Sequence, residues 1–148
     1  MALKPQKNSA ASIQVKPDSK TNIIGRTVLR YDSVDSTNAV ARKLGSEGVE
    51  EGTVILANTQ TKGIGRLNRT WVSPKGGLWF SIILRPNIRP SEATKLTLMA
   101  GSVVAKTLKA LYDLNARIKW PNDVLINGKK ICGILNEMRT SGDDIDYL

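Results

Sequence analysis

Short apolar runs separated by polar stretches recur along the chain, and most have the length of a strand. Runs rich in β-branched residues predict six strands, at Thr27–Tyr31, Thr53–Ala57, Leu78–Leu84, Arg117–Trp120, Val124–Ile126 and Lys130–Met138. Asn127-Gly128 separates the last two, and this dipeptide suits the positive φ angles of a type I′ turn. The pattern therefore predicts a hairpin there. Asp146-Tyr147-Leu148 has the composition of one further strand.

Two segments place apolar residues at helical spacing. In the first, Asp35 or Ser36 is a candidate N-cap, and the helix extends through Leu44 to Gly45 and Gly48. The second begins at Ser91 and continues to about Tyr112. Its apolar residues at helical spacing are Leu96, Met99, Val103 and Leu111, and its outward candidates are Lys95, Lys106 and Lys109. Strands mixed with two helices predict an α+β fold around a largely antiparallel sheet.

The composition limits the chemistry that the chain can perform. Its 148 residues, 41% of them hydrophobic, suit one globular domain. No apolar run is long enough for a membrane span and no secretory signal is visible, so we predict a cytoplasmic protein. Cys132 is the only cysteine and there is no histidine, which excludes a disulfide framework, histidine-dependent triads and the usual zinc sites. We predict no metal site built by the protein alone.

The formal charge of +9 is unevenly distributed. Residues 1–30 contribute +5, and residues 31–148 contribute +4. Residues 1–25 are rich in Lys, Ser, Asn and Pro and predict a mobile leader or a linker remnant, with the folded domain over residues 26–148. A mild positive excess suits an anionic small substrate as well as nucleic acid. A basic nucleic-acid-binding module is therefore an alternative, although aromatic residues are few and no helix gathers Lys and Arg on one face.

The segment Gln60–Trp71, QTKGIGRLNRTW, follows a predicted buried strand. Its glycines allow backbone amides to approach a ligand, its arginines can bind phosphate or carboxylate, and its tryptophan can pack on an aromatic ring. It is not a Rossmann fingerprint, because Asn68 stands at the third glycine position and no helix follows, and no P-loop pattern is present. A surface loop with solvated arginines is the alternative.

The segment Lys119–Asp123, KWPND, ends a predicted strand. Pro121 holds the residue before it in an extended conformation, so the neighbouring side chains are fixed. Lys119 is thereby a candidate to face an anion, and Asn122 and Asp123 are candidates to hold a nucleotide or a metal. A solvated lysine followed by turn residues is the alternative.

Two further segments carry weaker signals. Asp35–Asn38, DSTN, is typical of a helix cap, but its hydroxyls and amide can also bind the polar ring of a ligand. Gly133 within an apolar strand indicates a close approach of the backbone to a ligand or to a neighbouring strand. Cys132 has no histidine to activate it, so we interpret it as a packing residue.

Taken in order, these segments resemble the catalytic domain of biotin protein ligases, also called biotin–[acetyl-CoA-carboxylase] ligases. The residues that carry the resemblance are DSTN at 35–38, QTKGIGRLNRTW at 60–71, SPKGGLWFS at 73–81, KWPNDV at 119–124 and KKICGIL at 129–135. The family has a fold like that of class II aminoacyl-tRNA synthetases. The resemblance implies ATP-dependent ligation of biotin, with Mg²⁺ accompanying ATP. Biotin is activated as biotinyl-5′-AMP and transferred to a lysine of a biotin carboxyl carrier protein.

The resemblance also implies roles for individual residues. Lys119 would span the biotin carboxylate and the α-phosphate, and Arg66 would face the same groups, which makes these two the expected catalytic residues. The expected biotin contacts are Ser36, Thr37, Asn38, Gln60, Gly133, Ile134 and Leu135. The expected nucleotide contacts are Gly63, Ile64, Gly65, Arg66, Arg69, Trp71 and Asn122.

The chain departs from the family in its loop and in its extent. The family loop usually reads Gly-Arg-Gly-Arg-x-Gly-Arg, whereas Ile64 replaces the first arginine here and Asn68 the last glycine. The family continues with a further strand and a small SH3-like domain, so we expect a catalytic domain incomplete at its C-terminus. The open sheet edge that results predicts self-association as a homodimer. A lipoate-protein ligase or octanoyltransferase relative, or a non-catalytic remnant that binds biotin, are further alternatives.

Overall fold

The computed structural model describes residues 23–148. The prediction of a leader over residues 1–25 therefore falls almost wholly outside the described residues. At its last position, the backbone N–H of Gly25 donates to the carbonyl of Gly52 at 2.9 Å. The described chain forms two compact units. Unit 1 extends to Arg85 and includes Tyr147, and unit 2 comprises Pro86–Asp146 and Leu148. One domain over residues 26–148 stays a prediction.

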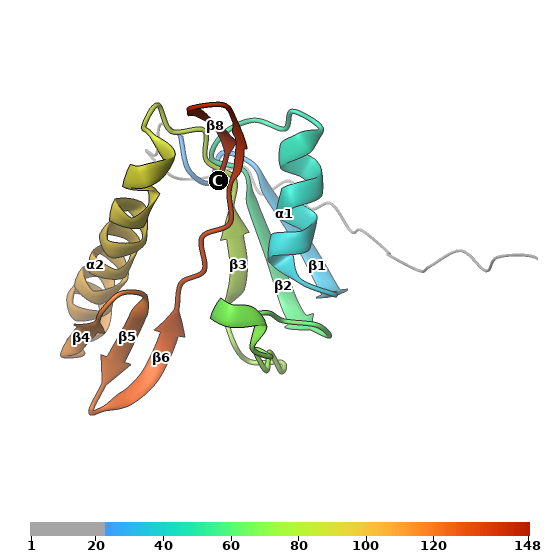
Figure 1. Ribbon diagram of the computed structural model, residues 1–148. Helices are drawn as coiled ribbons and strands as arrows, with labels where there is room; N and C mark the ends of the chain where they lie inside the picture. The colour runs from blue at the N-terminus through green and yellow to red at the C-terminus, as the bar shows by residue number, and fades with distance from the viewer. Residues whose placement is uncertain (1–22) are drawn as a thin grey trace, which may run out of the picture. The chain divides into compact units, whose positions relative to one another are not determined.

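Unit 1 contains a three-stranded sheet (Figure 1) in the order β1 (Val28–Val34), β2 (Val54–Gln60) and β3 (Trp79–Ile82). The helix α1 (Thr37–Ser46) connects β1 to β2, which pair in parallel, whereas β2 and β3 are antiparallel. A helical connection is what a parallel strand pair requires. The sheet is thus mixed at this point, while the α+β class predicted from the sequence is confirmed.

The core of unit 1 lies between the sheet and α1. Ile55 and Ile83 are almost wholly buried, and Tyr147 joins them from the last strand of the chain. Partly buried residues that pack on this cluster are Tyr31, Val40, Ala41, Leu44 and Val49. The predicted strand Thr53–Ala57 is therefore the buried centre of the sheet, as its apolar, β-branched composition indicated.

Unit 2 contains α2 (Ala93–Tyr112) and an antiparallel sheet of β4 (Ala116–Lys119), β5 (Asp123–Ile126) and β6 (Lys129–Gly133). Asn127 and Gly128 have φ of 49° and 76°, so the predicted two-residue hairpin is confirmed. A last pair of strands, β7 (Arg139–Ser141) and β8 (Asp144–Tyr147), follows, and β8 confirms the strand expected at the end of the chain.

Two sequence predictions in unit 2 were wrong in detail. The long helix begins at Ala93, after a 3₁₀ turn η2 (Pro90–Glu92) that contains the expected N-cap Ser91. Its buried residues are the smaller Ala93, Thr97 and Gly101. Asn136 donates to the carbonyl of Ala93 and to Thr97 Oγ1, and Gly101 lies near Ile118 of β4 and Ile134. Met99, Val103 and Leu111, three of the four apolar residues singled out from the spacing, are more than half exposed.

The last predicted strand also ends earlier than expected. It was predicted to reach Met138, but β6 stops at Gly133. The next residue, Ile134, instead donates its backbone N–H to the carbonyl of Asn122 at 2.9 Å. After β6, the chain therefore lies beside the turn that connects β4 to β5.

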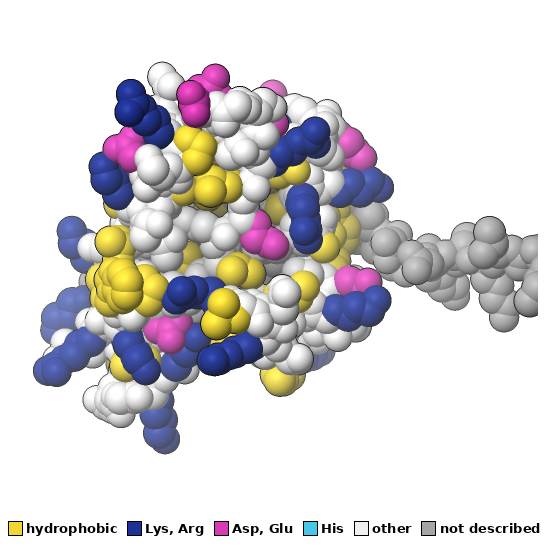
Figure 2. Space-filling view, in the orientation of Figure 1, with side chains coloured by type: hydrophobic (Ala, Val, Ile, Leu, Met, Phe, Trp, Pro, Cys, Tyr) yellow, Lys and Arg dark blue, Asp and Glu magenta, His cyan; other side chains and the backbone are white. Residues whose placement is uncertain are grey.

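On the face shown in Figure 2, Lys and Arg side chains are interspersed with Asp and Glu side chains. Within residues 23–148, no helix is long and apolar enough to cross a membrane.

Candidate functional site

The side chain of Gln60 is the centre of a polar network in unit 1. It stands at the end of β2, where Thr37 begins α1, and the two elements are neighbours because β1 and β2 are parallel. Gln60 Oε1 accepts hydrogen bonds from the backbone N–H of Thr37 at 2.8 Å and from Thr37 Oγ1 at 3.1 Å. The amide thus satisfies a donor in the first turn of the helix, where backbone N–H groups lack helical partners.

Ser81 extends this network from the neighbouring strand β3. Its hydroxyl lies 2.8 Å from Thr37 Oγ1 and also within hydrogen-bond distance of Asn38 Oδ1. Ser36, Thr37 and Ser81 are all buried, so this is a polar cluster inside the unit rather than a solvated helix end. Ser36 occupies the N-cap position but makes no capping hydrogen bond, so the cap predicted from DSTN is confirmed in position and not in chemistry.

Ser73 holds the other side of the Gln60 amide. Gln60 Nε2 donates to Ser73 Oγ at 2.8 Å, and the two residues also share a backbone hydrogen bond from Gln60 N to Ser73 O at 3.1 Å. Ser73 Oγ in turn donates to the carbonyl of Trp71 at 3.2 Å. Sequence analysis did not single out Ser73 or Ser81, although both stand inside the SPKGGLWFS segment that carries part of the family resemblance.

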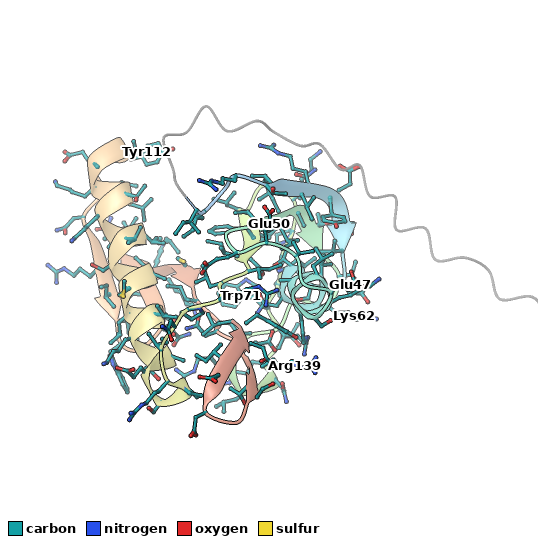
Figure 3. The ribbon with its side chains drawn as sticks, turned by 90° about the horizontal axis from the view of Figure 1, so that it is seen from above. Glu47, Glu50, Lys62, Trp71, Tyr112 and Arg139 are labelled. Carbon is teal, nitrogen blue, oxygen red and sulfur yellow. The ribbon has the colours of Figure 1, made fainter. Side chains whose placement is uncertain are left out.

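The loop that carries the two arginines is a small hairpin rather than an open turn. Trp71 N donates to Gly63 O at 2.8 Å, and Gly65 N donates to Arg69 O at 2.7 Å. Figure 3 labels Lys62, which precedes this hairpin in the sequence, and Trp71, which is its last residue. Arg66 and Arg69 are both exposed, and so is Ile64 between the glycines. The expected nucleotide contacts of unit 1 are therefore carried on one short, hydrogen-bonded loop.

Two features of this loop explain its sequence. A Cβ on Gly63 would lie 2.3 Å from the carbonyl oxygen of Trp71, so only glycine permits the observed approach. Asn68, which replaces a family glycine, has φ of 56°, in the left-handed region that asparagine tolerates better than most residues. Its neighbour Leu67 shares this φ and is 83% exposed, although leucine seldom adopts that conformation.

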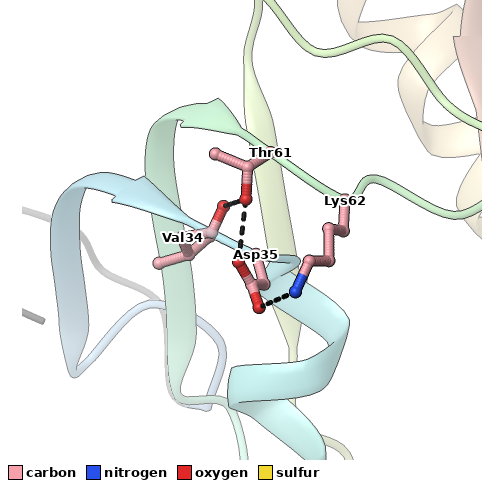
Figure 4. Close-up of polar contacts among 4 residues, drawn as sticks. All are labelled: Val34, Asp35, Thr61 and Lys62. Carbon is pink, nitrogen blue, oxygen red and sulfur yellow. Dashed lines mark hydrogen bonds and ion pairs between the residues drawn. The ribbon is translucent and has the colours of Figure 1, made fainter. Parts of the chain in front are cut away.

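Asp35 connects the start of α1 to the start of the loop (Figure 4). Its carboxylate accepts a hydrogen bond from Thr61 Oγ1 at 2.8 Å and pairs with Lys62 Nζ at 3.0 Å. The hydrogen bonds from Thr61 and Lys62 and the positive charge of Lys62 lower the pKa of Asp35. Backbone hydrogen bonds from Thr61 to Val34 and from Lys62 to Asp35 reinforce the same connection.

In unit 2, the expected catalytic Lys119 is the last residue of β4, opposite Asp123 in the register of the sheet. It is exposed and forms no ion pair with any residue that the structure describes. Lys130 is better fixed, because its Nζ lies 2.7 Å from Asp123 Oδ1 and its side chain is 37% exposed. Asp123 Oδ1 is buried, and its contact with Lys130 is an ion pair outside hydrogen-bond geometry.

Lys130 was absent from the predicted site, although a signal for it was present. Lys130 pairs with Leu125 in the hairpin, and Asp123 is two residues before Leu125, so Asp123 and Lys130 share one face of the sheet. The Asn-Gly turn predicted from the sequence therefore already indicated a diagonal lysine–aspartate pair.

The remaining predicted residues of unit 2 are joined directly. Asn122 Nδ2 donates to the carbonyl of Ile134 at 3.2 Å, and the backbones of the two residues are also hydrogen-bonded. Gly133 pairs with Asp123, and Leu135 follows Ile134 in a half-buried stretch. Burial raises the pKa of the Cys132 thiol, which agrees with its interpretation as a packing residue rather than a nucleophile.

Comparison with known proteins shows which family the chain is similar to. The model of the biotin/lipoate A/B protein ligase family matches residues 31–146. The bifunctional ligase/repressor BirA of Bacillus spizizenii is 41% identical over 143 residues, which cover 96% of this chain and 43% of that protein. The biotin–[acetyl-CoA-carboxylase] ligase of Paracoccus denitrificans is 41% identical over 113 residues, 75% of this chain and 47% of that one.

Solved structures give the same result. The biotin protein ligase from Aquifex aeolicus in complex with biotin and ATP is 36% identical with a TM-score of 0.64, covering 80% of this chain and 48% of that one. The Leishmania major enzyme in complex with biotinyl-5-AMP is 27% identical with a TM-score of 0.67, covering 80% and 53%. The chain spans less than half the length of the curated relatives named here. The fold is that of the biotin protein ligases, and the chain belongs to the biotin/lipoate A/B protein ligase family.

Proposed function

We propose that this chain provides the biotin- and adenylate-binding part of an ATP-dependent biotin–[acetyl-CoA-carboxylase] ligase. The observation that carries the proposal is the polar network around Gln60, in which buried hydroxyls and amides converge at the start of α1. A neutral ureido ring presents N–H donors and a carbonyl acceptor, and such a cluster offers both kinds of partner. The relatives that bind biotin and ATP support this assignment.

Unit 1 carries the residues proposed for biotin and for the adenylate. Ser36, Thr37, Asn38 and Gln60 are assigned to the biotin ring. The loop from Gly63 to Arg69 is assigned to the adenylate, where backbone amides and the guanidinium of Arg66 and Arg69 compensate negative charge. Trp71 is assigned to adenine, and half-buried as it is, its ring can offer an apolar surface.

Unit 2 carries the residues proposed for the nucleotide and the reacting groups. Gly133–Leu135 are assigned to biotin and Asn122 to the nucleotide. Two lysines are candidates for the fixed positive charge: Lys119, which the family resemblance suggested, and Lys130, which the ion pair with Asp123 holds in place. Lys119 forms no ion pair with a described residue, so its full charge is available to an anionic substrate, whereas the charge of Lys130 is offset by Asp123.

The proposed chemistry needs no histidine. In the first step an oxygen of the biotin carboxylate attacks the α-phosphorus of ATP, and the bond from that phosphorus to the pyrophosphate oxygen breaks. In the second step a neutral lysine amine of the acceptor attacks the biotinyl carbonyl carbon, AMP leaves, and the amine loses its proton to solvent. Because both reactants of the first step are anions, positioning and fixed positive charge supply the rate enhancement.

The remaining partners are proposed on the same basis. Mg²⁺ would enter with the phosphates of ATP, because within residues 23–148 no group of three or more Asp, Glu, Cys or His side chains could hold it. Asn122 and Asp123 are the candidates for contact with it. The proposed acceptor is a biotin carboxyl carrier protein, and the proposed location is the cytoplasm. The proposed homodimer would form through an outer strand of the unit 1 sheet, β1 or β3.

Calorimetry with the purified chain tests the proposal. Biotin and biotinyl-5′-AMP are titrated separately, with lipoate as the competing acyl group. We expect binding of both biotin compounds and none of lipoate. Gln60→Ala should weaken biotin binding about tenfold, because it leaves buried donors without a partner. Asn58→Ala, two residues earlier on the same strand and exposed, is the matched control. Tighter binding of lipoate than of biotin would contradict the proposal.

A further inference from the structure

We propose that Ser73 is a positioning residue, which fixes the orientation of the Gln60 side-chain amide and ties it to the end of the arginine-bearing loop. The proposal rests on the proposed function of Gln60 as a biotin contact. Ser73 itself is assigned no contact with substrate.

The geometry around Ser73 defines the role. A glutamine amide can be turned by 180°, which exchanges its donor and acceptor ends with little change in shape. Ser73 Oγ accepts from Gln60 Nε2 at 2.8 Å, so the amino end faces Ser73. The oxygen end then faces Thr37, whose N–H and hydroxyl both donate to it. The Thr37 N–H can only donate, so it requires the oxygen end of the amide, and Ser73 completes the same orientation by accepting from the amino end.

The Ser73 hydroxyl is itself held in place because its proton forms a hydrogen bond. It donates to the carbonyl of Trp71, and Ser73 is only 4% exposed, so water does not readily replace either hydrogen bond. A serine hydroxyl has a single donor, and commitment of that donor to Trp71 leaves an oxygen lone pair for Gln60. Donation therefore runs in one direction, from Thr37 to Gln60, from Gln60 to Ser73 and from Ser73 to the carbonyl of Trp71.

The same residue couples the biotin contact to the loop. Trp71 is the last residue of the loop hairpin, and its backbone N–H is bonded to Gly63. A Cβ on Gly63 would also lie 2.8 Å from Ser73 Oγ and 3.3 Å from Gln60 Nε2, which shows how closely the three residues pack. A displacement of the loop end must therefore move Ser73, and with it the Gln60 amide.

The first test observes Gln60 directly in the ligand-free chain. The sequence has only three glutamines, so their side-chain amide signals are few in a ¹⁵N-labelled sample, and those of Gln60 are the pair lost in Gln60→Ala. We expect the Gln60 amide protons to exchange with water at least tenfold more slowly than a free glutamine amide. Ser73→Ala should remove that protection, and Ser73→Thr, which keeps the hydroxyl, should restore part of it.

The second test measures biotin affinity in a mutant cycle. Ser73→Ala should weaken biotin binding about tenfold, the scale expected when a buried hydrogen-bonding group loses its partner. In the Gln60→Ala background the same change should have less than a twofold effect, because Ser73 acts through Gln60. Ser46→Ala is the control, since Ser46 is exposed and its hydroxyl bonds only to Lys43 within α1.

The outcomes separate this proposal from the function on which it rests. A wild-type chain that binds no biotin overturns the proposed function, whereas the amide exchange of Gln60 still decides the role of Ser73. Unchanged Gln60 protection in a folded Ser73→Ala variant overturns the positioning role. Equal losses of affinity from Ser73→Ala with and without Gln60 also overturn it, because they show a general structural effect.

Discussion

Lys130 Nζ lies 2.7 Å from Asp123 Oδ1, across the hairpin formed by β5 and β6. The pair holds a lysine ammonium against a carboxylate of which 19% is exposed. Lys119, on the strand at the other side of β5, has no comparable restraint among the described residues. The two lysines are therefore alternative candidates for stabilising negative charge during adenylation.

The lysine that serves this role is identified by a pair of variants. We expect Lys119→Ala to lower the rate of biotinyl-adenylate formation about a hundredfold, the scale observed for loss of one preorganised donor. Lys130→Ala should lower it only a few-fold, because the charge of Lys130 is offset by Asp123. Pyrophosphate release in a chain extended to the full length of its relatives measures both. The reverse order would make Lys130 the catalytic lysine.

The Asp35–Lys62 pair makes a prediction about acid stability. The folded-state pKa of Asp35 lies below its ordinary value, because Thr61 and Lys62 favour the carboxylate. Its contribution to stability is therefore present above the ordinary pKa of an aspartate and is lost as the pH falls through the lower, folded-state pKa. We expect Asp35→Asn to lower the melting temperature slightly at pH 6 and to have a progressively smaller effect as the pH falls.

Thermal unfolding at a series of pH values measures this difference. Both side chains of the pair are mostly exposed, so the effect at pH 6 should be small and should diminish at high salt. Asp32→Asn is the control, since that nearby carboxylate pairs with no lysine or arginine in the described residues. A difference between Asp35→Asn and the wild-type chain that does not diminish as the pH falls would contradict the assignment.

Gly63 and Gly65, both in the arginine-bearing loop, should differ in how well they tolerate substitution by alanine. A Cβ on Gly63 would meet the backbone of Trp71 at 2.3 Å, whereas on Gly65 its nearest neighbour would be 3.6 Å away. Gly63→Ala should therefore lower the free energy of unfolding by about 1–3 kcal/mol, the cost of overpacking. Gly65→Ala should change it by less than about 0.5 kcal/mol. Urea unfolding of the ligand-free variants measures both, and similar values would refute the close approach at Gly63.

Structural features set by residues close together in the sequence were predictable, whereas features set by residues far apart in the sequence were not. The hairpin at Asn127-Gly128 and the buried strand around Ile55 were predictable, because turn chemistry and apolar runs are local. The buried face of α2 was not, because it depends on residues distant along the chain: Asn136 donates to Thr97, and Gly101 lies near Ile118 and Ile134. A hydrophobic period shows that a helix forms, and packing decides which of its faces is covered.

The candidate site shows the same division. Its segments were found from motifs, and in unit 1 the structure joins Thr37, Asn38 and Gln60 in one network. Ser73 and Ser81 were missed, because a single serine carries no local signal and gains its role from partners distant along the chain. Lys130 was missed for a different reason, since its motif was noticed but its cross-strand partner Asp123 was not considered.

The final prediction concerns the core of unit 1, where the ring of Tyr147 packs on α1. A Cβ on Gly45 would lie 2.9 Å from Tyr147 Cδ2, whereas a Cβ on Gly101 in α2 would lie 3.7 Å from its nearest neighbour. Alanine has the higher helix propensity at both positions, by about 1 kcal/mol. Gly101→Ala should therefore be neutral or stabilising, while Gly45→Ala should destabilise by about 1–3 kcal/mol because the ring must move. Gly45→Ala combined with Tyr147→Leu should lose less than the two single variants added together, because a smaller side chain relieves the clash. Denaturant unfolding of the wild-type chain and the four variants measures these values, and strictly additive losses would show that Gly45 and Tyr147 are not in contact.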